Sequence, residues 1–482
     1  MELLLTCTYA FIFIGIIYKF SFFSIAGLSK KGLSVIFLIK VLAGFSLYLV
    51  YTYYYTDRSS ADTFKYFDDS KVLYDALWTH PKDFFQILFG LNEHSEYLQS
   101  NYFSHMHFWY NAYRNEGFID SRIIIRLNAV VRIFSMGYFN VHNVFFNFIS
   151  FSGLVALYKG FSWFRVNAKL LITGVFFIPS VLFWGSGVLK EAILLFGTGF
   201  LFLGFIRLNH NKIKLKCLLF FASGYFLLLY VKPYVLLSIT PALLAYLWVN
   251  KTNNRYILLK YLSLLFLGFI LLAGGSIIGK KYDVMQVIAD KQNDFVKMAE
   301  GGVYLSDGDT VLYYPDDKRN ELEQLDGTHF RVKNDTTGIS YIAIFNGPRS
   351  GSLIEMNELE PNPNSFLKAA PMALFIAFFR PFLFESFSPF MLLAGLENFV
   401  FIILLAGIAI FYKRPEQNHL NLIYFCLMFT FILYLFIGIT TPVMGAIVRY
   451  KIPALPFIFI TLALLIDGKK LTKRFPFLKK LI

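Results

Sequence analysis

Residues 179–196 read PSVLFWGSGVLKEAILLF, and their pattern decides how the chain folds. Apolar residues lie on both sides of a short turn in which Gly185 and Gly187 allow a tight backbone bend. Lys190 and Glu191 follow this bend at the start of the next apolar run. Two apolar helices joined by a short charged turn are typical of a hairpin that crosses a membrane twice. We therefore predict that this turn lies at one membrane surface.

The composition extends this prediction to the whole chain. Its 482 residues are 56% hydrophobic and 16% charged, whereas a soluble protein usually carries about 25% charged residues. The mean hydropathy is +0.55. The three cysteines, Cys7, Cys217 and Cys426, lie far apart inside apolar runs, which indicates neither a metal site nor a disulfide framework. The sequence predicts an all-α polytopic membrane fold.

Apolar runs of about 20 residues place about 11 transmembrane helices. They lie near residues 2–18, 33–55, 141–158, 170–186, 190–206, 217–231, 234–249, 261–279, 388–412, 420–438 and 452–466. The first run lacks a basic n-region and a small-residue cleavage site, so we interpret it as a retained span rather than a signal peptide.

The positions of the basic residues predict the orientation. Six polar breaks, at 19–31, 159–169, 207–216, 250–260, 413–419 and 467–482, hold 21 Lys or Arg residues and two acidic residues, Glu416 and Asp467. Basic breaks of this kind are cytoplasmic in polytopic proteins, so we expect the N-terminus outside and the C-terminus inside. The net charge of +14 then reflects topology, and we expect no nucleic-acid partner.

Two long segments, 56–140 and 280–387, are too polar to insert and are expected outside the cytoplasm. Apolar periodicity in 61–77 and 119–138 predicts interfacial amphipathic helices in the first segment. Turn residues predict a small irregular or β-containing subdomain in the second, which we interpret as a lid. The run 369–379 is too short to cross and predicts a re-entrant or interfacial helix.

The predicted organisation is therefore five consecutive regions. They are the first two transmembrane helices (1–55), the first outer loop (56–140), helices three to eight (141–279), the lid with its re-entrant segment (280–387), and helices nine to eleven with a basic cytoplasmic tail (388–482).

Charged residues at the outer ends of the spans are the candidates for chemistry, because charges near membrane depth are costly and usually functional. Asp62 follows the second span, with Arg58 before it and Tyr66 one helical turn after it. A carboxylate at the headgroup plane would serve as a general base. The alternative is that Asp62 only caps the N-terminus of a helix.

The turn at Lys190 and Glu191 offers a second candidate. Lys190 would bind a phosphate, and Glu191 a sugar hydroxyl or a neighbouring arginine. The alternative is that both side chains are ordinary headgroup contacts. The turn at Lys232 and Pro233 is similar but less specific.

Two later segments supply further cations. The segment FRPFLFES, 379–386, brings Arg380 and Glu385 to the outer face, and Arg449 and Lys451 lie at the outer start of the last span. The planar guanidinium of arginine can hold two phosphate oxygens at once, so we expect Arg449 and Lys451 to form the strongest cationic site. The alternative is that these side chains snorkel toward the interface.

Together these residues resemble a family. Asp62 with Tyr66, the FW-x-SG-x-x-KE turn at 183–191, FRPFLFES at 379–386 and VRYKIP at 448–453 are similar to bacterial O-antigen and exopolysaccharide polymerases and, more distantly, to the GT-C glycosyltransferase fold. The resemblance implies glycan transfer from an undecaprenyl-linked donor on the periplasmic face of the bacterial inner membrane. It implies Asp62 and Arg449 as catalytic residues, with the other outer charges and Tyr66 binding substrate.

The resemblance also sets expectations for partners. They are a polyprenyl-linked glycan donor, a glycan acceptor, membrane lipids and polysaccharide-assembly proteins. No soluble cofactor is required; a divalent metal would find acidic residues outside, but the sequence specifies no ligand set. The competing hypothesis is a flippase or transporter of lipid-linked oligosaccharide, which the lack of an internal repeat and the outer position of the charges disfavour. A purely structural role would leave the acids and bases at one membrane face unexplained.

The orientation can be tested without reference to function. Because the basic breaks predict the cytoplasmic side, a topology reporter fused after Asn320 should be active outside the cytoplasm, and one after Asn253 should be active inside. A cytoplasmic Asn320 would contradict the orientation and would place Asp62, Lys190 and Arg449 on the wrong side for a periplasmic donor.

Overall fold

The computed structural model of the chain describes residues 1–55, 58, 61–106, 108–109, 120–210, 214–278, 283–307, 310–326, 329–333, 338–386 and 388–476. The structure is mostly helical, at 75%. Nine helical segments within these ranges are long and apolar enough to cross a membrane. This agrees with a helical polytopic protein, with fewer long helices than the eleven predicted spans.

The nine segments include most of the predicted spans. They are α1 (Glu2–Lys19), α2 (Lys30–Tyr53), α7 (Phe139–Ser162), α10 (Lys190–His210), α12 (Pro233–Lys251), α13 (Ile257–Ile278), α16 (Pro389–Phe411), α17 (Gln417–Thr440) and a broken segment, Met444–Leu465. The broken segment consists of α18 (Met444–Tyr450), a 3₁₀ turn (Ile452–Ala454) and α19 (Leu455–Leu465).

Two predicted spans differ from the structure. The span predicted at 170–186 is instead two short helices, α8 (Ala168–Phe176) and α9 (Pro179–Trp184). The break has a local cause, because Pro179 disfavours helical backbone at Ile178, whose ψ is 123°. The span predicted at 217–231 is α11 (Leu215–Val231), which has only 17 residues.

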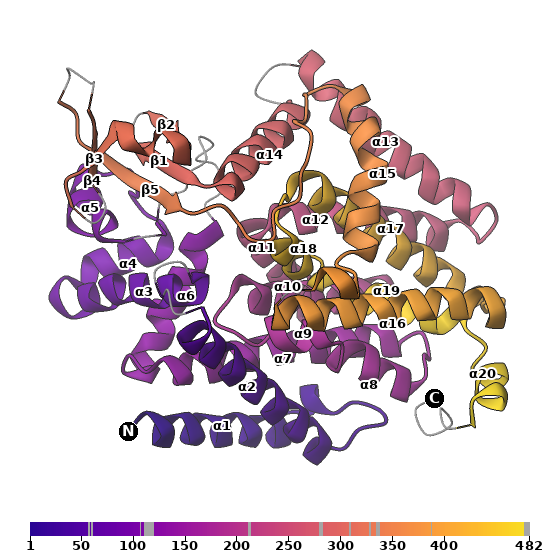
Figure 1. The fold of residues 1–482 in the computed structure, drawn as a ribbon. Coiled ribbons are helices and arrows are strands. Elements are labelled where there is room, and N and C mark those ends of the chain that lie inside the picture. Colours follow the sequence, from indigo (N-terminus) through magenta and orange to yellow (C-terminus); the bar gives the residue numbers. More distant parts are fainter. Residues whose placement is uncertain are drawn as a thin grey trace.

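The helix pair α7 and α10 forms the centre of the membrane part (Figure 1). Glycines allow the two backbones to approach closely, since a Cβ atom at Gly199 would lie 2.0 Å from the carbonyl oxygen of Gly153. Helix α10 also packs closely on α11, where a Cβ atom at Gly204 would lie 2.4 Å from the amide nitrogen of Phe221. Close packing here fixes the position of the N-terminus of α10, where Lys190 and Glu191 lie.

The first outer segment is helical. It consists of α3 (Asp62–Thr79), α4 (Pro81–Phe89), α5 (Glu96–Asn101) and α6 (Asp120–Ser135). Two of these four helices, α3 and α6, lie where the periodicity predicts helices. Helices α3 and α6 pack together, and the buried Arg132 of α6 donates to the carbonyl oxygen of Phe67 on α3 (2.5 Å). The apolar faces of these helices are therefore largely covered by each other and by α7.

The second outer segment contains α14 (Val284–Glu300), a small antiparallel sheet and α15 (Pro363–Phe379). The strands are β1 (Gly302–Ser306), β2 (Val311–Tyr314), β3 (Leu322–Gln324), β4 (His329–Val332) and β5 (Tyr341–Gly347), in the order β2-β1-β5-β4-β3. The sheet lies in the segment for which a β-containing subdomain was expected. Helix α15 begins at Pro363, earlier than the apolar run predicts, and ends before Arg380.

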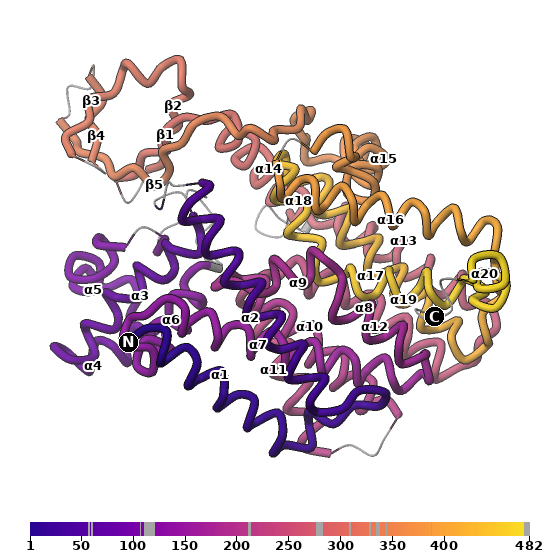
Figure 2. Tube along the Cα trace, turned by 60° about the horizontal axis from the view of Figure 1, so that its bottom comes forward, coloured from indigo at the N-terminus to yellow at the C-terminus, as the bar shows by residue number. Residues whose placement is uncertain are grey.

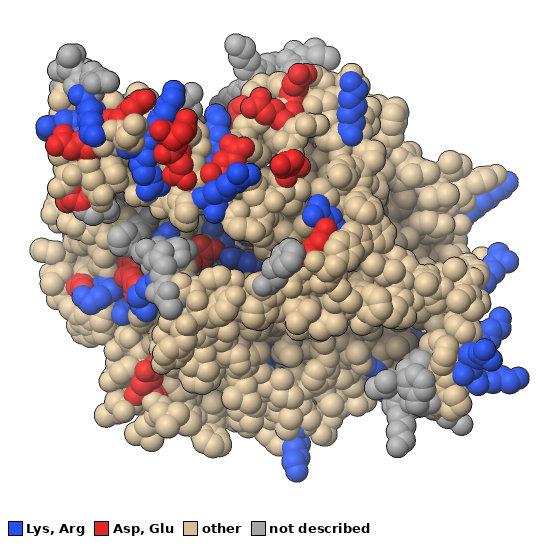
Figure 3. Space-filling model, in the orientation of Figure 1, with Lys and Arg blue, Asp and Glu red and all other residues tan. Residues whose placement is uncertain are grey.

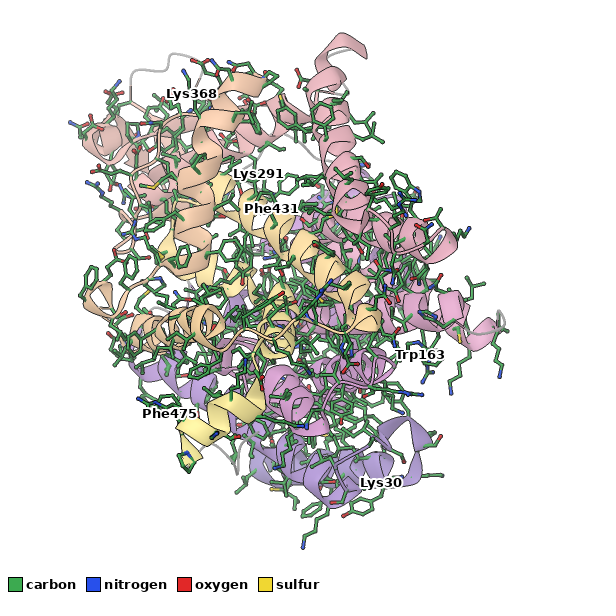
Figure 4. All side chains as sticks on the ribbon, turned by 90° about the vertical axis from the view of Figure 1, so that its right-hand side faces the viewer. Lys30, Trp163, Lys291, Lys368, Phe431 and Phe475 are labelled. Carbon is green, nitrogen blue, oxygen red and sulfur yellow. The ribbon has the colours of Figure 1, made fainter. Side chains whose placement is uncertain are left out.

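The sheet and α3–α6 lie at one end of the molecule (Figure 2). On the face drawn in Figure 3, acidic and basic side chains mix around this end, whereas the opposite edge, near α20 (Gly468–Arg474), shows basic side chains only. Figure 4 views the molecule from that opposite side, where Lys30, Trp163 and Phe475 come from three of the breaks expected in the cytoplasm. The orientation itself remains a prediction.

Candidate functional site

Three segments far apart in the sequence meet at Arg449. The guanidinium of Arg449, on α18, donates from Nη2 to Oδ2 of Asp62 (3.1 Å) on α3. It donates from Nε to Oε1 of Glu191 (3.3 Å) on α10, and its Nη2 lies 3.3 Å from the same oxygen. One arginine thus joins an outer helix to two membrane helices through two carboxylates.

Local structure explains the position of Asp62. Asp62 is the first residue of α3, and Ala61 is the N-cap, with no side-chain capping bond. The alternative that Asp62 serves only as an N-terminal cap is therefore wrong. Its carboxylate points to Arg449 instead, and an acidic residue in the first turn still interacts favourably with the helix dipole.

The glycine turn before α10 positions Glu191. The buried Lys40 of α2 donates from Nζ to the carbonyl oxygen of Gly185 (2.6 Å) and to Oγ of Ser186 (2.9 Å). A Cβ atom at Gly185 would lie 2.4 Å from the carbonyl oxygen of Val181, so the turn needs glycine there. Lys40 was not identified from the sequence, although a lysine inside an apolar span is a general indication of function.

The side chains of the three charged residues differ in how exposed they are, and this determines what each one can contact. The side chain of Glu191 is 1% exposed, that of Arg449 18% and that of Asp62 34%. Glu191 is therefore a buried carboxylate that needs a cation, and the headgroup alternative is wrong for it. Asp62 is the more accessible of the two carboxylates. Arg449 turns inward to both, which contradicts the snorkelling alternative.

Aromatic rings and a second cation complete the cluster. Nζ of Lys232 lies 4.0 Å from Oε1 of Glu191 and 3.6 Å from the centroid of the Tyr450 ring. Cζ of Arg449 lies 5.5 Å from the centroid of the Trp184 ring. Both are cation–π distances, and they stabilise cations away from bulk water. The sequence had indicated Lys232 only as a less specific candidate, and it had given Trp184 no role.

Lys190 and Tyr66 lie together beside this cluster. Nζ of Lys190 is 5.3 Å from the centroid of the Tyr66 ring, and Tyr66 is buried, with its ring 5.3 Å from that of Phe108. Lys190, the first residue of α10, therefore adds a cation next to α3 of the first outer segment. Tyr66 offers little surface to a substrate.

Three other predicted residues have separate partners. Arg58 forms an exposed pair with Asp68, with Nη2 2.6 Å from Oδ1. Arg380 pairs with Glu385 inside its own turn, with Nη2 2.9 Å from Oε1. These pairs satisfy the charges locally, and the structure shows no contact between them and Arg449 within the described ranges.

Lys451 does not belong to the cationic site that the sequence predicted for it together with Arg449. It is 1% exposed, and its Nζ donates to Oδ1 of Asn398 (2.9 Å) on α16. Arg449 and Lys451 therefore do not form one cationic surface, because they point to different partners. Asn398 also donates to the carbonyl oxygen of Pro381 (3.1 Å), so Lys451 helps to hold the turn after α18 against α16 and against the turn of Arg380.

The second outer segment reaches the same site through its backbone. The amide of Ile354 donates to the carbonyl oxygen of Pro442 (2.7 Å), and the amide of Met444 donates to that of Ser352 (2.9 Å). These bonds join the end of the sheet region to the first residue of α18. Figure 3 shows a recess between the sheet region and the membrane helices, with acidic and basic side chains inside it.

Comparisons with known proteins add no relative. No family model matches the chain, and no curated protein or solved structure is significantly similar to it. Within the described residues, no group of three or more His, Cys, Asp or Glu side chains has the spacing of a metal site.

We expect Arg449→Ala to destabilise the protein strongly, because Glu191 would remain buried and, among the described residues, its remaining ion-pair partner would be Lys232 at 4.0 Å. Removing one partner of a buried ion pair costs about 3 to 5 kcal/mol. The free energy of unfolding, measured for the purified protein in detergent, should fall by about this amount. Adding Glu191→Gln to the same chain should recover a large part of the loss.

Arg319→Ala is a matched control. Its exposed pair with Asp316 (3.1 Å) should contribute less than about 1 kcal/mol. Wild-type stability of Arg449→Ala would show that the guanidinium does not hold the three segments together.

Proposed function

We propose that the chain is a membrane glycosyltransferase that extends a surface polysaccharide. It would transfer glycan from an undecaprenyl-linked donor to a glycan acceptor on the periplasmic face of the bacterial inner membrane. The observation that supports this proposal is the meeting of Arg449, Asp62 and Glu191 at one end of the membrane helices, where both outer segments join them. A lipid-linked donor carries its phosphates at the headgroup level, which is the level expected for helix ends.

The two carboxylates would have different roles, which follow from how exposed each one is. Glu191, at 1% exposed, is enclosed and binds Nε and Nη2 of Arg449, so it orients the guanidinium. Asp62, at 34% exposed, contacts Arg449 through one oxygen and remains accessible. Asp62 is thus the carboxylate that can accept a proton from an acceptor hydroxyl.

Arg449 would stabilise the leaving group. Its Nη1 makes no hydrogen bond to any residue that the structure describes, whereas Nε and Nη2 are engaged by the carboxylates. The two N–H groups of Nη1 are available for a phosphate oxygen. Lys232, near Glu191, and Lys190, beside Tyr66, add positive charge close to the cluster, which would favour the departing polyprenyl phosphate or pyrophosphate.

The proposed reaction is a single displacement. The oxygen of the acceptor hydroxyl forms a bond to the anomeric carbon of the donor sugar, and Asp62 takes the hydroxyl proton. The bond between the anomeric carbon and the phosphate oxygen breaks, and its electron pair leaves with the phosphate, whose charge Arg449 stabilises. The products are the lengthened glycan and the free polyprenyl phosphate or pyrophosphate, so no soluble cofactor enters the balance.

Asp62→Asn should abolish transfer and spare donor binding. The amide can still accept a hydrogen bond from Nη2 of Arg449, but it cannot take the proton, so the rate should fall by at least about 100-fold. The measurement is polymer length and yield in a strain that carries the variant as its only copy. Asp75→Asn is the matched control on the same helix, since its carboxylate pairs with Lys71 (2.9 Å) at the surface. Full-length polymer at the normal rate from Asp62→Asn would contradict the assignment.

The same strains distinguish transfer from transport. Without a polymerase, single repeat units should still reach the cell surface, because another protein exports them. Without a flippase, lipid-linked units should accumulate inside. The proposal predicts the first outcome for Asp62→Asn, and the second would favour the transporter.

A further inference from the structure

The first outer segment contains a hollow of about 700 Å³ where α4 ends and the chain turns toward α5. Gln86, Gly90, Asn92, Glu93, His94 and Tyr97 are among its lining residues. The volume lies in the range of small-molecule sites. None of these residues belongs to the Arg449 cluster, and the sequence had indicated none of them.

Three polar side chains in the hollow are available to a ligand. The side chains of Gln86, Asn92 and His94 make no hydrogen bond to any residue in the described part of the chain. An amide and an imidazole can each donate and accept. Together they offer several donors and acceptors on one concave surface, which suits a ligand with many hydroxyl groups.

Glu93 provides a carboxylate that is held in place. Its Oε2 lies 2.7 Å from Nη1 of Arg122, and its Oε1 pairs with Nη2 of Arg126. Both arginines come from α6 and lie over the ring of Trp109, with Cζ 5.1 and 5.4 Å from its centroid. The carboxylate is thus an oriented acceptor for hydroxyl groups.

Tyr97 provides an aromatic face. Its side chain is on the surface, at 52% exposed, but its hydroxyl donates to Oδ2 of Asp83 (2.8 Å), which also accepts from Tyr102 (2.8 Å). The hydrogen bond to Asp83 raises the pKa of the Tyr97 phenol, so the group remains neutral. A fixed, uncharged ring beside free amides can cover the apolar C–H face of a sugar.

We infer that this hollow is an acceptor subsite that binds uncharged sugars of the growing glycan. The inference rests on the proposed function. The hollow and the Arg449 cluster are joined through one layer of packed residues, since Arg122 donates to the carbonyl oxygen of Trp109 (3.1 Å) and the neighbouring Phe108 packs on Tyr66. Tyr66 lies one helical turn after Asp62 on α3. Packed side chains therefore connect the hollow to the helix that begins with Asp62.

The test uses the purified full-length protein in detergent. The probe is a mixture of neutral oligosaccharides released by mild acid from the cell's own surface polysaccharide. We expect Tyr97→Ala to weaken their binding about tenfold, as measured by calorimetry, and to shorten the polymer in cells. Asn92→Gly is a second variant, because glycine keeps the positive φ of 54° while removing the amide. It should weaken binding in the same direction without touching the bond between Tyr97 and Asp83.

Tyr256→Ala is the control, since Tyr256 is 60% exposed in the turn before α13 and lies outside the hollow. It should bind the probe as the wild type does. Wild-type binding and polymer length in both hollow variants would overturn the inference. A wild-type protein that binds the oligosaccharides in this hollow but transfers no glycan would leave the subsite in place and contradict the proposed function.

Discussion

The structure depends on the ion pair between Glu191 and Arg449. Burying a carboxylate that is 1% exposed is costly without cations beside it, and Arg449, the cation with the shorter contacts, comes from a segment 258 residues later. The pair therefore fixes the N-terminus of α10 against α18. Asp62 adds the third contact and joins the first outer segment to the same guanidinium. Apolar side chains of similar volume would usually stabilise such a place as well as an ion pair does, so the charges support the proposed function.

The surrounding packing positions these two residues. The contact of Gly153 with Gly199 brings α7 and α10 together, and Lys40 holds the turn that precedes Glu191. On the other side, Lys451 and Asn398 fix the turn that follows α18. The contact of Gly153 with Gly199 is a close backbone approach, and the contacts of Lys40 and Lys451 are buried hydrogen bonds at turns next to helix ends. The proposed division between an orienting Glu191 and a reachable Asp62 follows from how deeply each is enclosed.

The sequence patterns predicted where the long helices lie along the chain better than they predicted which side chains contact one another. Runs of apolar residues located most of the long helices, and charged residues at their ends included Asp62, Glu191 and Arg449. Hydrophobicity along the chain does not state which way a side chain points around its helix. For that reason the different partners of Arg449 and Lys451 and the contribution of Lys40 could not be predicted. The helix break before Pro179 could have been predicted from the sequence, because proline disfavours helical backbone at the residue before it.

The most direct measurement uses the purified protein in detergent micelles with a polyprenyl-linked oligosaccharide donor and a glycan acceptor. Micelles have no two sides, so transport has no meaning in them, whereas an enzyme still works. The account predicts that the glycan becomes longer and that polyprenyl phosphate or pyrophosphate is released, and that both stop in Asp62→Asn. An unchanged donor in micelles, together with movement of the same donor across the bilayer of proteoliposomes, would contradict it.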